Sequence, residues 1–299
     1  MKETLPSFSL VVPTYGRPCK LRACLQALSA VDYPRGRFEV IVVDDGSPSS
    51  MESVVAPFRE RMTLALVRQE HSGPATARNT GATNAKGTFL AFTDDDCLPA
   101  RSWLKELAKR FAEAPEDMVG GRTINALIDN YYSTASQELI SYLYDYYASA
   151  YGEPRLFTSN NLAIPAGRFR EIGGFDAGFA LAAGEDRELC DRWLCGGLKM
   201  TYAPNAVVHH AHALNLRSFW RQHFNYGRGA LRCHQLRATR SCGRMKVEPL
   251  SFYLNMLRYP FSRLPGRQAL LVAPLIAISQ SANAAGFFWE KGKRRIPET

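Results

Sequence analysis

Three consecutive carboxylates, Asp94, Asp95 and Asp96, follow the β-rich run 88–92 after a single residue, Thr93. Carboxylates on one tight turn repel one another unless a cation or a set of hydrogen-bond donors lies among them. Hard divalent cations such as Mn²⁺ and Mg²⁺ take oxygen ligands, often one or two carboxylates together with substrate phosphates. The alternative is a solvated acidic turn, or the cap of a helix that begins near Pro99. The position of the triplet right after a buried strand favours the metal site.

A second acidic pair, Glu185-Asp186, follows Gly184 at the start of a predicted helix. A hydroxyl group is a poor nucleophile until a general base removes its proton, and a carboxylate beside a pocket can do this. Acidic residues in a first helical turn also interact favourably with the helix macrodipole. The pair by itself therefore does not decide between a base and a structural role.

Two shorter polar groups are weaker signals. A carboxylate in the segment 44–47, Asp-Asp-Gly-Ser, could accept hydrogen bonds from a nucleobase or ribose, but the glycine and serine also fit a structural turn. Three histidines, His209, His210 and His212, follow a strand-like run and could supply a metal ligand. At least one of them is expected to be structural.

The elements that position these groups follow from the hydrophobic pattern. Short β-rich runs alternate with helical stretches, which is typical of βαβ units and a mostly parallel sheet. In such sheets ligands bind beyond the carboxyl ends of the strands, where the polar segments 13–17, 44–47 and 93–96 lie. The predicted strands are 8–12, 38–43, 63–67 and 88–92.

Composition narrows the class of protein. The 299 residues are 46% hydrophobic and 22% charged, which excludes a disordered chain, and the net charge of +9 should attract anions. No GxGxxG follows the first strand, which argues against a dinucleotide oxidoreductase, and no nucleic-acid module surrounds the basic segment 223–232. Seven scattered cysteines and an N-terminus without a long apolar stretch favour reduced thiols and a cytoplasmic location.

Several ordered motifs resemble those of family 2 glycosyltransferases with the GT-A fold. They are SLVVPTYGR, VIVVDDGSPS, GPATARNTGATNAKGTFLAFTDDDCLP, NNLAIPAGRFREIGGFD and GEDRELCDRWLCGG, and they extend over residues 7 to 213. The resemblance implies an α/β protein with a Rossmann-like, mixed, mostly parallel sheet flanked by helices. It divides the chain into a catalytic domain, 1–213, and a basic helical C-terminal extension, 214–299.

The resemblance also implies residue roles, carried over by position. Asp186 would be the catalytic base, and Glu185 would shape the acceptor site beside it. Asp45 is preferred over Asp44 as the partner of the nucleobase. The donor site would comprise Pro13, Thr14, Tyr15, Arg17, Asp44, Asp45, Arg78, Asp94 and Asp95, the metal site Asp96, Asp94 and His210, and the acceptor site Asn160, Asn161 and Gly174.

The implied activity is inverting transfer of a hexosyl group from a nucleotide-diphosphate sugar, such as a UDP-sugar, to a hydroxyl acceptor. The cofactor would be Mn²⁺ or Mg²⁺, the acceptor a saccharide or a lipid-linked molecule of a cell-envelope polysaccharide, and no nucleic acid would be bound. A noncatalytic binding module for nucleotide sugars or lipid phosphates on the same fold is one alternative, and a nucleotidyltransferase is another. The acidic triplet and the Glu-Asp pair favour the transferase.

The C-terminal stretch 269–289 is long enough to span a bilayer, at about 20 residues, but contains a proline and several polar residues. Such polarity favours an interfacial or core helix over a lipid-exposed span. Basic residues flank it on both sides: Arg258, Arg263, Arg267, Lys291, Lys293, Arg294 and Arg295. We therefore expect peripheral contact with an anionic membrane surface on the cytoplasmic face, with a soluble protein as the alternative.

Overall fold

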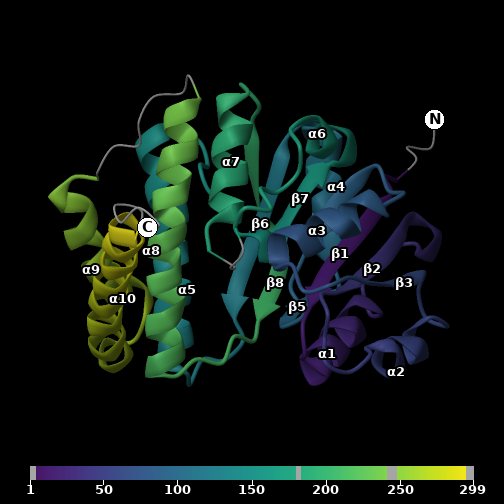
Figure 1. Ribbon diagram of the computed structural model, residues 1–299, viewed down its shortest axis with the longest axis horizontal. Helices are drawn as coiled ribbons and strands as arrows, with labels where there is room; N and C mark the ends of the chain where they lie inside the picture. The colour runs from purple at the N-terminus through teal and green to yellow at the C-terminus, as the bar shows by residue number, and fades with distance from the viewer. Residues whose placement is uncertain (1–4, 180–182, 241–247, 294–299) are drawn as a thin grey trace, which may run out of the picture.

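The computed structural model describes residues 5–179, 183–240 and 248–293. Figure 1 shows a twisted sheet on one side of the molecule and a group of long helices on the other. The sheet has eight strands in the order β3-β2-β1-β4-β7-β6-β8-β5. Its strands are β1 (Phe8–Thr14), β2 (Phe38–Asp44), β3 (Leu64–Arg68), β4 (Phe89–Phe92), β5 (Cys97–Pro99), β6 (Met118–Asn125), β7 (Leu162–Pro165) and β8 (Met200–His210).

The N-terminal half of the sheet is the parallel βαβ arrangement that the sequence predicts. β1 pairs in parallel with β2 and β4, and β2 pairs in parallel with β3. β1 is buried along its whole length, as expected for a central strand covered on both faces. The helices of this half are α1 (Pro18–Leu28), α2 (Glu52–Val55), α3 (Pro74–Thr83) and α4 (Trp103–Glu113), with short 3₁₀ turns at Arg35–Arg37 and Ala56–Phe58.

The second half of the sheet is mixed. β7 runs antiparallel to both β4 and β6, and β6 runs parallel to β8. The segment after the acidic triplet forms β5, which pairs antiparallel with β8, and α4 begins only at Trp103. The expected helix start near Pro99 is therefore wrong, because Pro99 pairs with Val208 in this ladder. The remaining elements of this half are the 3₁₀ turn Ser159–Asn161, α6 (Ala166–Glu171) and α7 (Glu185–Cys195).

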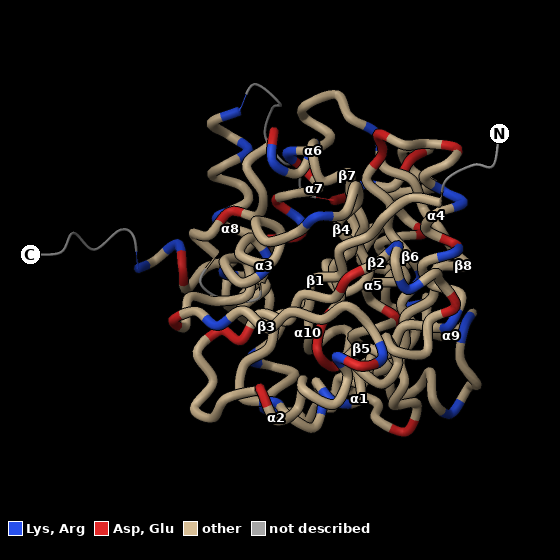
Figure 2. Tube along the Cα trace, turned by 90° about the vertical axis from the view of Figure 1, so that its right-hand side faces the viewer, with Lys and Arg blue, Asp and Glu red and all other residues tan. Residues whose placement is uncertain are grey.

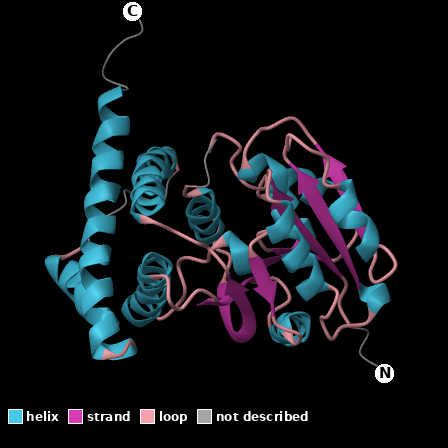
Figure 3. Cartoon of the chain, turned by 90° about the horizontal axis from the view of Figure 1, so that it is seen from below, coloured by secondary structure: helices cyan, strands magenta, loops and turns pink. Residues whose placement is uncertain are grey.

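Four long helices pack together beside the sheet, as Figure 3 shows from below. They are α5 (Tyr131–Tyr151), α8 (Leu216–Thr239), α9 (Leu250–Arg263) and α10 (Gly266–Lys293). One buried apolar cluster joins Leu139 of α5 to Phe219 of α8, Met256 of α9 and Ile276 of α10. The extension 214–299 thus shares a core with α5 of the first part of the chain, and the domain boundary at residue 213 stays a prediction.

Five cysteines, Cys19, Cys24, Cys97, Cys190 and Cys233, are free thiols. Cys195 is disulfide-bonded, so the expectation of reduced cysteines is wrong at that residue. Cys242, like Arg294 and Arg295, lies outside the described residues.

Candidate active site

A cavity of about 640 Å³ opens at the carboxyl ends of the parallel strands and continues between the sheet and the long helices. It is lined by Thr14 at the end of β1, by Arg78 of α3, by Asp94 after β4 and by Asp186 of α7. Its far end is lined by residues of α5, α8, α9 and α10, including Leu139, Tyr226 and Met256. The cavity thus brings together polar groups from elements that are distant in sequence.

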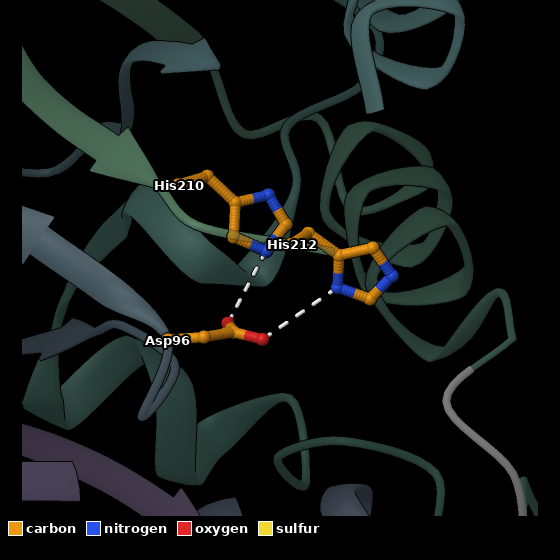
Figure 4. Close-up of side chains that lie close together, drawn as sticks. All are labelled: Asp96, His210 and His212. Carbon is orange, nitrogen blue, oxygen red and sulfur yellow. Dashed lines mark ion pairs between the residues drawn. The ribbon is translucent and has the colours of Figure 1, made fainter. Parts of the chain in front are cut away.

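Asp96 lies against two histidines, as Figure 4 shows. His210 Nε2 is 3.2 Å from one carboxylate oxygen of Asp96, and His212 Nδ1 is 3.5 Å from the other. One donor atom from each residue lies within 4.8 Å of those of the other two. Pairing of Cys97 with His210 in the β5–β8 ladder fixes the two segments side by side.

Cations also surround Asp96. Arg17 Nη1 and Lys20 Nζ lie 3.2 and 3.1 Å from the same oxygen that faces His212. Burial alone would raise the pKa of the Asp96 carboxyl, but the hydrogen bonds from His210 and His212 and the charge of Arg17 hold it well below its ordinary value. Asp96 is therefore an anion in a site built to hold positive charge.

Asp95 has a different environment. Its buried carboxylate accepts hydrogen bonds from Thr14 Oγ1 at 2.7 Å and Arg17 Nε at 3.0 Å, and Arg17 Nη2 lies 2.7 Å from its other oxygen. Burial raises the pKa of Asp95 to about 6 in spite of these partners. Asp95 does not line the cavity, so it acts on the site by positioning Arg17 and Thr14, which do.

Arg78 links the acidic triplet to the acidic helix start. Its buried guanidinium donates to Asp94 at 2.8 Å and to Glu185 at 2.9 Å. Burial alone would lower the pKa of Arg78, but Asp94 and Glu185 raise it above the usual value. The planar fork of arginine suits this bridge between two carboxylates. Asp94, which the sequence analysis also assigns to the metal, is paired with Arg78 and lies outside the group of Asp96, His210 and His212.

Asp186 lines the cavity without an ion-pair partner among the described residues. From the residues that the structure describes, its carboxylate accepts only backbone hydrogen bonds, from Arg187 at 2.7 Å and from Ser159 at 3.4 Å. Gly184 precedes the helix with a φ of +99°, a conformation that favours glycine. The turn at Gly184 places the first residues of α7 at the wall of the cavity.

The two neighbouring carboxylates of α7 are both less acidic than usual. Burial raises the pKa of Asp186. Burial and the charge of Asp186 raise the pKa of Glu185 to about 7. Two coupled groups of this kind are well placed for proton transfer near neutral pH.

The candidate base-binding residues differ in their access to the cavity. Asp45 lines it and accepts hydrogen bonds from Gln69 and from the backbone of Ser72 and Gly73, each at 2.7–2.9 Å. Asp44 is buried away from it and accepts from the Ser47 backbone. Of the two residues, Asp45 is thus the one with access to the cavity, and its role stays a prediction.

Pro13 and Tyr15 line the mouth of the cavity. The Tyr15 ring is stacked on the His71 ring, with centroids 4.3 Å apart. Tyr15 is half-exposed, so this stacked pair offers an aromatic surface next to Asp45.

Of the three candidate acceptor residues, only Asn160 lines the cavity. Asn161 is buried, accepts from Trp103 Nε1 at 2.9 Å and donates to two backbone carbonyls. A Cβ at Gly174 would lie 2.6 Å from Asn79 Oδ1, so this glycine permits close packing of its turn against α3. Asn161 and Gly174 thus hold the frame around the site.

Several cavity residues are absent from the sequence-based set. His212 joins Asp96 and His210, and its signal was the histidine cluster itself. Three further residues had no local signal: His71 and Tyr226, which line the cavity, and Lys20, which contacts Asp96. The loop before α3, the middle of α8 and the first turn of α1 look like ordinary surface or core segments.

Comparisons with known proteins give a consistent picture. The family model described as Glycosyl transferase family 2 matches residues 9–175. Glycosyltransferase AglE of Haloferax volcanii is 26% identical over 239 residues, which cover 79% of this chain and 77% of that protein. Pre-mycofactocin glycosyltransferase of Mycobacterium tuberculosis is 30% identical over 233 residues, which cover 74% of this chain and only about half, 46%, of the relative.

Solved structures share the fold. Mannosyltransferase PcManGT from Pyrobaculum calidifontis, in complex with GDP-Man and Mn²⁺, has a TM-score of 0.66 at 21% identity, covering 97% of this chain and 89% of its own. S. aureus TarS 1-349 in complex with UDP-GlcNAc has a TM-score of 0.55 at 18% identity, covering 97% and 92% of the two chains. The mixed, mostly parallel GT-A sheet with its helical C-terminal region is thereby confirmed.

Proposed function

This chain belongs to glycosyl transferase family 2, and we propose that it transfers a hexosyl group from a nucleoside-diphosphate sugar to an acceptor hydroxyl, with inversion at the anomeric carbon. The observation that carries the proposal is the shared cavity. It joins the Asp186 carboxylate, which has no ion-pair partner among the described residues, to Asp94, Arg78 and the Asp96 site.

The nucleoside would bind at the N-terminal end of this cavity. Asp45 would accept hydrogen bonds from the base, and the Tyr15–His71 pair would cover its face. Asp94 and Arg78 would lie toward the ribose and the diphosphate. The neighbours solved with GDP-Man and UDP-GlcNAc support a nucleotide-sugar donor without selecting the base.

Asp96, His210 and His212 would hold the divalent cation. Their donor atoms converge within 4.8 Å, and Asp96 Oδ1 contacts only His210 among the described residues. A set of one carboxylate and two imidazoles suits Mn²⁺ better than Mg²⁺, which prefers oxygen ligands. When bound, the cation would neutralise the negative charge that develops on the leaving diphosphate.

Asp186 would act as the general base. It would take the proton of the acceptor hydroxyl while that oxygen forms a bond to the anomeric carbon and the bond from this carbon to the diphosphate oxygen breaks. One displacement without a covalent intermediate inverts the configuration. Arg78 would hold Glu185 and Asp94 in place, and Glu185 would shape the acceptor side next to the base.

The C-terminal helices would place the enzyme at a membrane. α10 is long and apolar enough to cross one, with a mean hydropathy of 1.4 over its most apolar 18 residues, of which 28% are buried within the protein. Its exposed side carries Leu270 and Leu271 at one end and Phe288 and Trp289 at the other, and 18 residues make five helical turns, so these pairs share one face.

Basic residues mark α9 and the end of α10, as Figure 2 shows. They include Arg258 and Arg263 of α9 and Lys291 and Lys293 of α10. An apolar stripe with basic flanks fits peripheral binding to anionic headgroups on the cytoplasmic face. A saccharide or lipid-linked acceptor of the cell envelope would be accessible at that surface.

A donor screen tests the proposed activity. The full chain would be incubated with UDP- and GDP-hexoses and N-acetylhexosamines, with Mn²⁺, Mg²⁺ or EDTA, and release of nucleoside diphosphate would be measured. We expect release from at least one donor with Mn²⁺ and its loss with EDTA. Asp96→Ala should abolish it while the circular dichroism spectrum stays unchanged. Equal release in EDTA and from Asp96→Ala would contradict the metal site.

A further inference from the structure

A second cavity, of about 380 Å³, lies beside the first and belongs to none of the roles assigned above. Its walls are β6, α5, Tyr202 of β8 and the turn between α9 and α10. The side chains that matter for its chemistry are Arg122, Glu138, Tyr144, Tyr202, Tyr259 and Arg263.

Glu138 is the unusual member of this wall. Glu138 is only 8% exposed to solvent, and its Oε2 atom has no hydrogen-bond partner among the described residues. Burial raises the pKa of this carboxyl, although the charge of Arg263 opposes the effect. Buried polar groups in folded proteins are nearly always hydrogen-bonded, and one that is not requires an explanation. A ligand in the cavity would supply the missing partner.

The other walls indicate the chemistry of that ligand. Arg122 and Arg263 offer hydrogen-bond donors to a molecule in the cavity, and the carboxylates of Glu138 and Asp145 offer acceptors. These formal charges cancel, which disfavours a multiply charged anion. The rings of Tyr144 and Tyr202 meet edge to face, with centroids 6.0 Å apart. A sugar ring has both apolar faces for such aromatics and hydroxyls that donate and accept.

The second cavity shares part of its wall with the first. Thr123, Asn125, Gln137 and Ile140 line both. Asn125 also pairs with His210 in the β6–β8 ladder, one strand away from the Asp96 site. A molecule that occupies both cavities would pass along these four residues.

We propose that the second cavity is a distal subsite for a saccharide unit of the acceptor, so that the acceptor contains at least two sugar residues. The proposal rests on the proposed transferase function and adds the class of acceptor. Glu138 would bind hydroxyls of this distal sugar and would be a positioning residue without a part in the chemistry.

Saccharide series of increasing length test the proposal on the full chain. Mono-, di- and trisaccharides of mannose, glucose and N-acetylglucosamine would be titrated with UDP or GDP and Mn²⁺ present, and dissociation constants measured by NMR. We expect at least one series to gain about tenfold in affinity on lengthening, as for hydrogen bonds to a charged group. Glu138→Gln should remove this gain and leave monosaccharide affinity unchanged. Glu60 is exposed and lines neither cavity, so Glu60→Gln serves as the matched control.

Two further readings separate the outcomes. Because burial raises the pKa of Glu138, its ionised form opposes folding above the ordinary glutamate pKa, so Glu138→Gln should raise Tm at pH 8 while it weakens oligosaccharide binding. Nucleotide affinity, measured separately by calorimetry, reports failure of the donor site instead. Absence of a length effect in every series, an effect that persists in Glu138→Gln, or inorganic phosphate binding that Glu138→Gln strengthens would overturn the subsite.

Discussion

At the scale of single residues, the site separates its carboxylates by the partners given to each. Asp96 is surrounded by Arg17, Lys20 and two histidines, whereas within the described part of the chain Asp186 receives only backbone hydrogen bonds. The pKa of the aspartate carboxyl is thus lowered at Asp96 and raised at Asp186. The first environment suits charge stabilisation, and the second suits proton removal.

This difference predicts the pH dependence of the reaction. A base works only when deprotonated, and the pair of Glu185 and Asp186 takes up its first proton near pH 7, because burial and mutual charge raise the pKa of Glu185 to about 7. We expect kcat/KM to be low at acidic pH and to increase as the pH rises through about 7. Initial rates from pH 5 to 9 would measure this increase of kcat/KM with pH.

Glu185→Gln is the informative variant for that profile. It removes the group that titrates near pH 7, so the rise of kcat/KM with pH should move to lower pH. Because the variant also loses the ion pair with Arg78, circular dichroism would check that the fold is intact. A wild-type profile that is flat from pH 5 to 8 would show that neither carboxyl controls the rate.

Residue roles were predictable where several motifs occurred in order. Asp186, Asp45 and Arg78 all line the cavity, although their roles stay predictions. Two contacts were not predictable: that of His212 with Asp96 and that of Arg78 with Asp94. Both depend on side-chain geometry between elements that meet only in the folded chain. Asn161 and Gly174 lie in the expected motifs but serve packing.

At the scale of elements, hydrophobic periodicity predicted the parallel strands β1 to β4 within about one residue at most ends. It did not predict β5, because three residues after an acidic turn carry no periodic signal. The antiparallel pairing of β5 with β8 places His210 beside Asp96, and its register arises from contacts over 100 residues apart in sequence. Composition likewise did not predict that α5 lies between the sheet and the C-terminal helices.

The contact between α8 and α10 yields a prediction at this scale. A Cβ at Gly227 would lie 1.8 Å from the carbonyl oxygen of Asn283, and one at Gly286 would lie 1.9 Å from that of Phe224. Gly227→Ala should therefore lower the free energy of unfolding by about 1–3 kcal/mol through overpacking, although alanine is the better helix former. Urea denaturation would measure it.

Gly292 of α10 provides the matched control, since a Cβ there meets nothing within 4 Å. Gly292→Ala should leave the free energy of unfolding unchanged or raise it by up to about 1 kcal/mol. Equal effects of the two substitutions would show that α8 and α10 are not held together at the glycines.

At the scale of the whole molecule, the catalytic cavity, the second cavity and the apolar face of α10 all involve the group of helices beside the sheet. The extension shares a core with α5, so its removal would expose Leu139 and its neighbours. Surface substitutions therefore test membrane contact better than truncation does.

Cosedimentation with vesicles makes this test. The full chain should bind anionic vesicles more strongly than neutral ones at low salt, because each basic residue near an anionic surface contributes about 1 kcal/mol. The double variant Leu270→Ser/Phe288→Ser should weaken binding, and high salt should weaken it only in part, because apolar burial is not screened. If the protein stays in the supernatant with anionic vesicles at low salt, the exposed apolar face of α10 does not bind membranes.

The central claim is that Asp186 removes the acceptor proton in a sugar transfer, and Asp186→Asn tests it most directly. With a donor identified by the screen, nucleotide-sugar affinity would be measured by calorimetry and turnover by product formation on the same samples. We expect donor affinity within a few-fold of wild type and turnover lower by about a hundredfold or more, as for loss of a general base. A collapse of donor affinity, or turnover close to wild type, would contradict the assignment.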